Sequence, residues 1–215
     1  MSPRCREYLT NEKLDADVSI CVEQYKLEHW AHLSYADAVY MASGKIFHSN
    51  LLNFHGMMLH ASAIALDGKA YLFSGPCGTG KSTHTGLWQQ VFGENAKVFN
   101  DDKPSLRRLE DGWFAYGTPW SGKNEININM KVPLAGICFL KQSEKNEIRR
   151  LTPLEALPLV ISQTMHRFRN VEKLDLMLKL TEQLVQEIPI YQFYNRPEPE
   201  AALMSYHAMR QGAEE

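Results

Sequence analysis

Two pairs of short apolar runs, each pair divided by a turn signal, occupy the middle of the chain. Asp-Gly and similar pairs tolerate the left-handed backbone of tight turns, so they are typical of β-hairpins. The pattern predicts two hairpins: strands 57–66 and 70–74 around Asp67-Gly68, and strands 105–109 and 113–116 around Glu110-Asp111-Gly112.

Further strands are predicted outside the hairpins. Val132–Leu140 is a continuous apolar run, which suits a strand buried on both faces. Val98-Phe99 predicts a short strand that ends at Asn100-Asp101-Asp102. Partial alternation of apolar and polar residues also predicts strands over 17–27 and 188–194.

Helical periodicity begins behind the first hairpin. Residues 82–92 place Leu87, Trp88, Val91 and Phe92 on one helical face, and Gly93 is a typical C-terminal stop. A second helix is predicted over 34–53, with Ser34 as its N-cap.

The last third of the chain is predicted to be mostly helical. Thr152-Pro153-Leu154-Glu155 combines a capping box with proline at the first helical position, which marks a helix start. Pro158 lacks an amide donor and is expected to bend or interrupt that helix. Apolar residues recur at helical spacing from Leu174 to Ile188, and a closing helix is predicted over Pro199–Met209.

Strands come first and helices later, without a repeated strand–helix–strand rhythm. This order predicts a mixed α/β (α+β) fold with a mixed sheet and C-terminal helices. A chain of 215 residues is long enough for one domain, and 1–215 is expected to form a single domain. Within it we expect an N-terminal extension (1–45), a core (57–140) and a helical part (150–215).

Composition and charge limit the classes of binding partner that the chain is expected to have. Hydrophobic residues make up 44% and charged residues 22%, and the formal net charge is −2, which gives no electrostatic case for nucleic acid or an anionic membrane. No apolar run approaches the roughly 18 residues that span a bilayer, and the start of the chain lacks a signal-like apolar stretch. The cysteines Cys5, Cys21, Cys77 and Cys138 lie far apart, which favours a reduced, cytoplasmic protein without zinc.

The run Gly75-Pro-Cys-Gly-Thr-Gly-Lys81-Ser82 matches the phosphate-binding pattern G-x-x-x-x-G-K-[ST] at every position. Its glycines let successive backbone N–H groups turn around phosphate oxygens, and the following helix adds its N-terminal dipole. Lys81 is expected to reach the β- and γ-phosphates of ATP and the Ser82 hydroxyl to ligate Mg²⁺. The predicted nucleotide-binding set is Gly75, Pro76, Cys77, Gly78, Thr79, Gly80, Lys81, Ser82 and Thr83.

Asp101-Asp102 lies twenty residues beyond Lys81, at the end of a short strand. Phosphoryl transfer needs a carboxylate near the metal and often a second one to accept a proton from the nucleophile. We assign Asp101 as the general base and Asp102 to the metal. The alternative is a solvated turn, because Asn-Asp-Asp is also good turn chemistry.

The run from His60 through Asp67-Gly68 to Lys81-Ser82, with Asp101-Asp102 downstream, resembles the catalytic domain of HPr kinase/phosphorylase. The Gly-Thr-Gly-Lys core is also similar to ATP-dependent phosphoenolpyruvate carboxykinase. The resemblance implies a carboxykinase-like phosphate-loop fold, use of ATP and Mg²⁺, and phosphorylation of a serine hydroxyl. It implies that 1–215 is a catalytic domain and that 57–140 is its nucleotide-binding core. It also implies that His60 sits beside the acceptor and the phosphates as a catalytic residue.

The chain departs from the full-length kinases in two ways. Thr83 stands where HPr kinases typically carry glutamate, and their large N-terminal domain has no counterpart here. The chain looks most like short single-domain relatives that occur beside peptide-modification genes, some of which phosphorylate a serine of a precursor peptide.

Two weaker groups of candidates remain. Lys123 and Glu125, in the loop from Gly117, either contact the transferring phosphoryl group and the metal or belong to a surface loop. Arg167 and Arg169 either touch phosphate or an acidic acceptor, or form a solvated helix end.

The sequence therefore predicts an ATP-dependent kinase for a hydroxyl of a peptide, protein or small molecule. Carboxykinase-like chemistry on a small acid and a non-catalytic, ATP-dependent sensor are the alternatives. Homo-oligomer formation is left open.

Overall fold

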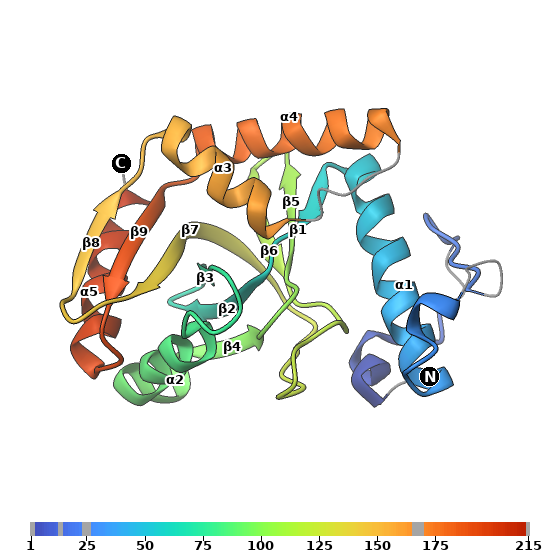
Figure 1. Cartoon of the computed structure of the whole chain (residues 1–215), viewed down its shortest axis with the longest axis horizontal. Helices are drawn as coiled ribbons and strands as arrows, with labels where there is room; N and C mark the ends of the chain where they lie inside the picture. Colours follow the sequence, from blue (N-terminus) through green and yellow to red (C-terminus); the bar gives the residue numbers. More distant parts are fainter. Residues whose placement is uncertain (1–2, 13–14, 23–26, 165–169, 214–215) are drawn as a thin grey trace.

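A mixed β-sheet forms the centre of the fold, with helices packed on both of its faces (Figure 1). The computed structural model describes residues 3–12, 15–22, 27–164 and 170–213. Nine strands pair within these ranges. They are β1 (Gly56–Met58), β2 (Ala61–Leu66), β3 (Lys69–Ser74), β4 (Lys97–Asn100), β5 (Ser105–Leu109), β6 (Gly112–Tyr116), β7 (Lys131–Gln142), β8 (Glu147–Arg150) and β9 (Ile190–Asn195). The main strand order is β1-β5-β6-β7-β3-β2-β4, and β9 pairs with β7 and β8.

The five α-helices of the described chain account for most of the remaining ordered backbone. They are α1 (Tyr35–Leu51), α2 (Lys81–Phe92), α3 (Pro153–Gln163), α4 (Val171–Glu187) and α5 (Pro199–Gly212). Short 3-10 turns lie at Pro3–Tyr8, Leu27–Trp30, Leu52–Phe54 and Gly93–Asn95. The mixed sheet and the C-terminal helices confirm the predicted fold class.

Alternation along β2 and β3 divides the core into two layers. Ala63 and Leu72 face a cluster that includes Met177 of α4, whereas Ile64 and Phe73 face a cluster that includes Trp88 of α2 and residues of α5. Successive side chains of a strand point to opposite faces, so one hairpin anchors both helical layers. In Figure 1, α3 and α4 accordingly lie on one side of the hairpin and α2 and α5 on the other.

The direction of the central strands fixes which ends meet. Strand β2 is antiparallel to both β3 and β4, and β3, β7 and β9 are mutually parallel along the sheet. The carboxyl ends of β3, β4, β7 and β9 therefore lie at one edge of the sheet, together with the amino end of β2. This edge carries the residues discussed below.

Most local predictions are confirmed. Both hairpins form, and the first turns at Asp67 and Gly68, whose φ angles are 52° and 73°. Such positive values at both turn positions match the twist of the flanking strands. The Ser34 side chain caps α1 by accepting from the Asp37 amide, and the capping box of Thr152 and Glu155 is complete.

Three local predictions are corrected, and one strand was missed. Residues 17–22 form no strand, and residues 23–26 of that predicted segment lie outside the described chain. The predicted strand 57–66 is two strands, because β1 pairs with β5 whereas β2 pairs with β3 and β4. Helix α3 continues through Pro158 and is not interrupted there. Pro158 cannot donate a hydrogen bond to the Leu154 carbonyl, but Leu154 is exposed in the first turn, so water can bond that carbonyl instead. Strand β8 was not predicted.

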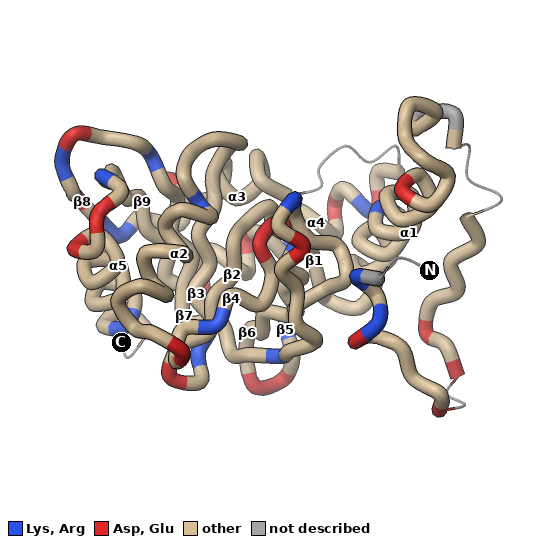
Figure 2. The backbone as a smooth tube through the Cα atoms, turned by 90° about the horizontal axis from the view of Figure 1, so that it is seen from below, with Lys and Arg blue, Asp and Glu red and all other residues tan. Residues whose placement is uncertain are grey.

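Charged residues of both signs are distributed over the whole chain rather than gathered by sign. Figure 2 shows Lys and Arg interspersed with Asp and Glu along the tube, in keeping with the formal net charge of −2. Within the described ranges no helix is both long and apolar enough to cross a membrane.

Candidate functional site

The glycine-rich loop joins the end of β3 to the start of α2. Gly75, Gly78 and Gly80 have φ angles of 143°, 84° and 94°, which L side chains rarely adopt. Gly80 is the N-cap of α2, so the first free amides of that helix face the loop. The Thr79 hydroxyl donates to the Pro76 carbonyl over 2.9 Å and braces the turn. The predicted strand–loop–helix context of the motif is thus present.

Lys81 lies buried inside this loop. Its Nζ donates to the carbonyl oxygens of Gly75 and Pro76 at 2.8 and 3.1 Å. Burial lowers the pKa of the Lys81 ammonium, while the charge of Asp102 acts in the opposite direction. These two hydrogen bonds hold the Lys81 ammonium inside the glycine-rich loop. Ser82 and Thr83, by contrast, are exposed in the first turn of α2.

His60 lies at the amino end of β2, between the glycine loop and the acidic pair. Its carbonyl accepts from the Ser74 hydroxyl at 2.9 Å, which ties it to the residue before the loop. The next residue, Ala61, donates its amide to the Asp102 carbonyl at 3.1 Å. Because β3 and β4 flank β2, the three segments carrying His60, Lys81 and Asp102 meet at one edge of the sheet.

The His60 ring contacts two acceptor oxygens. Nδ1 lies 3.1 Å from Oε1 of Gln163, and Nε2 lies 3.3 Å from Oδ1 of Asp102. The Nε2 group of Gln163 donates to the Ser162 hydroxyl, so Oε1 of Gln163 faces the His60 ring. Through these two contacts the ring connects α3 to the acidic pair.

Asn100 shapes the turn that carries the two aspartates. Its Oδ1 accepts from the amides of Asp102 and Lys103 at 3.1 and 2.7 Å, and its Nδ2 donates to the Thr118 carbonyl at 3.0 Å. Asn100 is fully buried. This side-chain turn fixes the backbone of Asp101 and Asp102, in keeping with the turn chemistry of Asn-Asp-Asp.

Asp101 is the more buried of the two aspartates, with 7% of its surface exposed. Its Oδ1 accepts from the Gly122 amide at 2.6 Å. Burial raises the pKa of the Asp101 carboxyl, and the neighbouring charge of Asp102 adds to the rise, although the Gly122 amide opposes it. A carboxylate with a raised pKa is a better proton acceptor than an ordinary aspartate.

Asp102 has the opposite electrostatic character. Burial alone acts to raise the pKa of Asp102, but the hydrogen bond from His60 and the contact with Lys103 outweigh burial and hold that pKa at about 2. Asp102 is therefore fully ionised at neutral pH. Two adjacent carboxylates with pKa values displaced in opposite directions suit two different tasks.

The magnesium prediction can be checked against these side chains. The described residues contain no group of three or more His, Cys, Asp or Glu that could hold a metal alone. Magnesium bound with a nucleotide usually takes only one or two protein ligands besides water and phosphate oxygens. An ionised Asp102 and an exposed Ser82 hydroxyl fit that requirement.

The weaker candidates are placed less favourably. Lys123 is exposed, and Glu125 forms an ion pair with Arg4 at 2.6 Å. Arg167 and Arg169 lie outside the described residues. Three residues that the sequence analysis did not single out, Asn100, Gly122 and Gln163, contact the predicted site instead.

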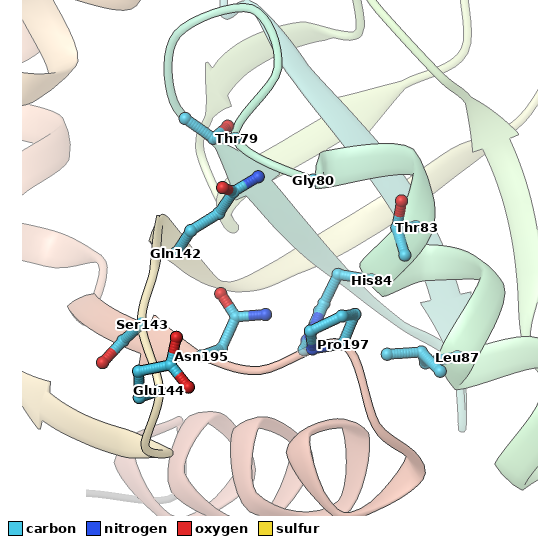
Figure 3. A pocket seen from close by; sticks show the side chains of 10 residues that line it. All are labelled: Thr79, Gly80, Thr83, His84, Leu87, Gln142, Ser143, Glu144, Asn195 and Pro197. Atoms are coloured by element: carbon cyan, nitrogen blue, oxygen red, sulfur yellow. The ribbon is translucent and has the colours of Figure 1, made fainter.

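A cavity of about 590 Å³ opens beside the glycine loop, at the carboxyl ends of β7 and β9. We name it the β7–β9 cavity; it is lined by Thr79, Gly80, Thr83, His84, Leu87, Gln142, Ser143, Glu144, Asn195 and Pro197 (Figure 3). Gln142 links it to the loop by donating from Nε2 to the Gly78 carbonyl at 3.0 Å. The sequence analysis did not predict this cavity.

The fold and the site together define a mixed α/β protein with a glycine-rich loop and an acidic pair at one sheet edge. The family model described as SynChlorMet cassette protein ScmC matches residues 38–194, and the chain belongs to this family. No curated protein matches the chain.

Among solved structures, the chain is similar to the Hpr(Ser) kinase/phosphatase from Coxiella burnetii. The identity is 11% and the TM-score 0.41, over 73% of this chain and 94% of that one. At this distance, residue roles can come only from the geometry of this chain.

Proposed function

We propose that this protein transfers the γ-phosphoryl group of ATP to a hydroxyl, with a peptide serine as the preferred acceptor. The observation that carries the proposal is the meeting of Lys81, Asp101 and Asp102 at one edge of the sheet. The serine and the peptide are suggested by the sequence resemblance to short peptide-modifying relatives. ATP, the metal and the acceptor are all parts of the proposal.

The glycine loop binds the triphosphate in this account. Its positive-φ glycines and the start of α2 offer backbone amides to phosphate oxygens. Lys81 exchanges its bonds to the Gly75 and Pro76 carbonyls for phosphate oxygens, because an ammonium prefers charged acceptors. Its charge then opposes the negative charge that develops on the transferring group.

Asp101 acts as the general base. The acceptor oxygen forms a bond to the γ-phosphorus while the bond from that phosphorus to the β,γ-bridging oxygen breaks, and ADP leaves. The hydroxyl proton moves to the carboxylate of Asp101. The Gly122 amide holds one oxygen of this carboxylate in place.

Asp102 and Ser82 would hold Mg²⁺, which supplies positive charge to the phosphate oxygens when bound. His60 contacts Asp102 and is fixed by Gln163, so it orients this carboxylate. The ring is partly exposed, so Nε2 can exchange its contact with Asp102 for a phosphate oxygen.

A labelled-transfer experiment tests the proposal. The purified chain is incubated with Mg²⁺ and γ-labelled ATP together with a library of serine peptides, and label in peptide is measured alongside ADP formation. We expect label in a serine peptide, lost in Asp101→Asn although that variant still binds ATP. Binding of ATP without transfer to any peptide would favour the sensor alternative.

A further inference from the structure

Asn195 lines the β7–β9 cavity and carries a buried hydrogen-bond acceptor without a partner among the described residues. It is the last residue of β9 and only 6% exposed, and its backbone carbonyl accepts from the Ser143 amide at 3.1 Å. Its side-chain Oδ1 is buried and has no hydrogen-bond partner among the described residues. Figure 3 shows the amide projecting into the space between Gln142 and His84. Buried acceptors are rarely left in this state without a reason.

His84 lines the same cavity and supplies a second unpaired acceptor. Its Nε2 lies 2.9 Å from the Ser205 hydroxyl oxygen. That hydroxyl donates to the Ala202 carbonyl and accepts from Nε1 of Trp88, so it can only accept from His84. Nε2 therefore carries the proton and Nδ1 carries a lone pair. Nδ1 is buried and lacks a partner within the described chain.

The ring of His84 stays neutral, which preserves this arrangement. Burial lowers the pKa of His84 to about 3. Phe73 and Phe193 pack edge-on against the ring, with centroid distances of 4.4 and 5.6 Å. The ring thus has a fixed orientation, whereas the Asn195 amide can turn about its last bond at low cost.

The strand order decides what kind of group this cavity can receive. β9, β7, β3, β2 and β4 follow one another across the sheet edge, so the glycine loop after β3 separates the cavity from Asp101 after β4. In the proposed reaction the acceptor hydroxyl lies at Asp101, on the β4 side of the loop. The opposite end of a triphosphate held in the loop extends toward the cavity, which Gln142 links to Gly78.

We propose that the β7–β9 cavity binds the nucleobase and that Asn195 and His84 select a base with an exocyclic amino group, the 6-amino group of adenine. Unpaired acceptors require hydrogen-bond donors, which the amino group of a base supplies. Leu87 and Pro197 give the cavity apolar surface for the faces of the ring. The proposal rests on the proposed function, because it needs the triphosphate in the glycine loop.

Calorimetric titrations separate the contribution of the base to binding from that of the phosphates. Wild-type protein with Mg²⁺ is titrated with ATP, with purine riboside 5′-triphosphate, which lacks only the 6-amino group, and with inorganic triphosphate. We expect ATP to bind about tenfold or more tightly than the purine riboside compound, since its amino group satisfies buried acceptors. Inorganic triphosphate should bind more weakly than either.

Variants assign the preference to Asn195. Asn195→Ala should bring the two nucleotides to within about threefold of each other and leave inorganic triphosphate unchanged, which also shows that the variant is folded. Asn53→Ala, at an exposed position in the 3-10 turn Leu52–Phe54, is the matched control and should keep the wild-type preference. Equal wild-type affinity for the two nucleotides, with triphosphate bound, would overturn the base proposal alone. Binding of none of the three would instead overturn the proposed function.

Discussion

The amide of Gly122 donates to Oδ1 of Asp101 over 2.6 Å, and Gly122 also packs directly against that carboxylate. A Cβ atom at this position would lie 3.1 Å from Oδ2 and 3.2 Å from Cγ of Asp101. In the same loop, the Ile126 carbonyl accepts a hydrogen bond from the Asp101 amide at 3.3 Å. The loop therefore holds both the backbone and the side chain of the proposed base.

Gly122→Ala should displace the Asp101 carboxylate by a few tenths of an ångström or more. We expect phosphoryl transfer to fall about tenfold to hundredfold, because a small misplacement of a catalytic group is costly. ATP affinity should change little, since the glycine loop is not touched. Steady-state transfer rates and calorimetric ATP titrations measure the two effects.

Gly86→Ala is the matched control for that substitution. Apart from the backbone of α2 itself, no atom of the described residues lies within 4 Å of a Cβ at Gly86, in the interior of this helix. Alanine there should raise the free energy of unfolding by about 0.5–1 kcal/mol and leave transfer unchanged. Equal transfer rates in the two alanine variants would contradict the role given to Gly122.

Asp101→Asn removes the proton acceptor while preserving the size of the side chain. Transfer should drop by about a hundredfold or more, with ATP binding retained. Asp111→Asn, on the exposed turn between β5 and β6, is the control and should behave as wild type. A kinase that works at full rate with asparagine at position 101 would need a different base.

The pH dependence of transfer should report Asp101. The base is active when ionised, and burial raises the pKa of the Asp101 carboxyl above its ordinary value of 3.8. The rate constant kcat/KM should therefore decline on the acid side at a pH above that of an ordinary aspartate. An acid limb at or below pH 3.8 would remove Asp101 from this role.

Asp102 should contribute to stability over a defined pH range. Its pKa is about 2 in the folded protein against an ordinary 3.8, so its stabilising effect is complete above pH 3.8 and is lost as the pH falls through 2. Asp102→Asn should lower the free energy of unfolding at pH 7 by about 1–2 kcal/mol, and the difference should shrink toward pH 2. Urea unfolding without Mg²⁺ measures this. A pH-independent difference would show that the ionic contacts with His60 and Lys103 do not stabilise the fold.

Local signals made the central elements predictable. The Asp67-Gly68 turn, the capping box at Thr152 and the glycine loop each depend on residues close together in sequence, and each formed as predicted. Strand β8 was missed because Glu147–Arg150 is mostly charged and depends on pairing with β9. An edge strand of this composition carries no apolar alternation to detect.

The site was predicted only in part, for a related physical reason. Lys81 and the acidic pair belong to short motifs, whereas Gly122 and Gln163 reach the site by long-range contacts from a loop and a helix end. Asn195 is a polar residue in an apolar strand, and nothing local distinguishes its buried side chain from a surface one. Asn100, by contrast, was accessible to sequence reasoning, because asparagine before two acidic residues is typical of a side-chain turn.

Magnesium-dependent binding of ATP tests the central claim most directly. Calorimetry of the wild-type chain should show saturable ATP binding that requires Mg²⁺. Lys81→Met, which keeps the buried stem but removes the ammonium, should weaken binding about tenfold to hundredfold. Lys97→Met, at an exposed position on β4, should not. Absence of magnesium-dependent affinity in the wild-type protein, or identical affinity in Lys81→Met, would contradict the account.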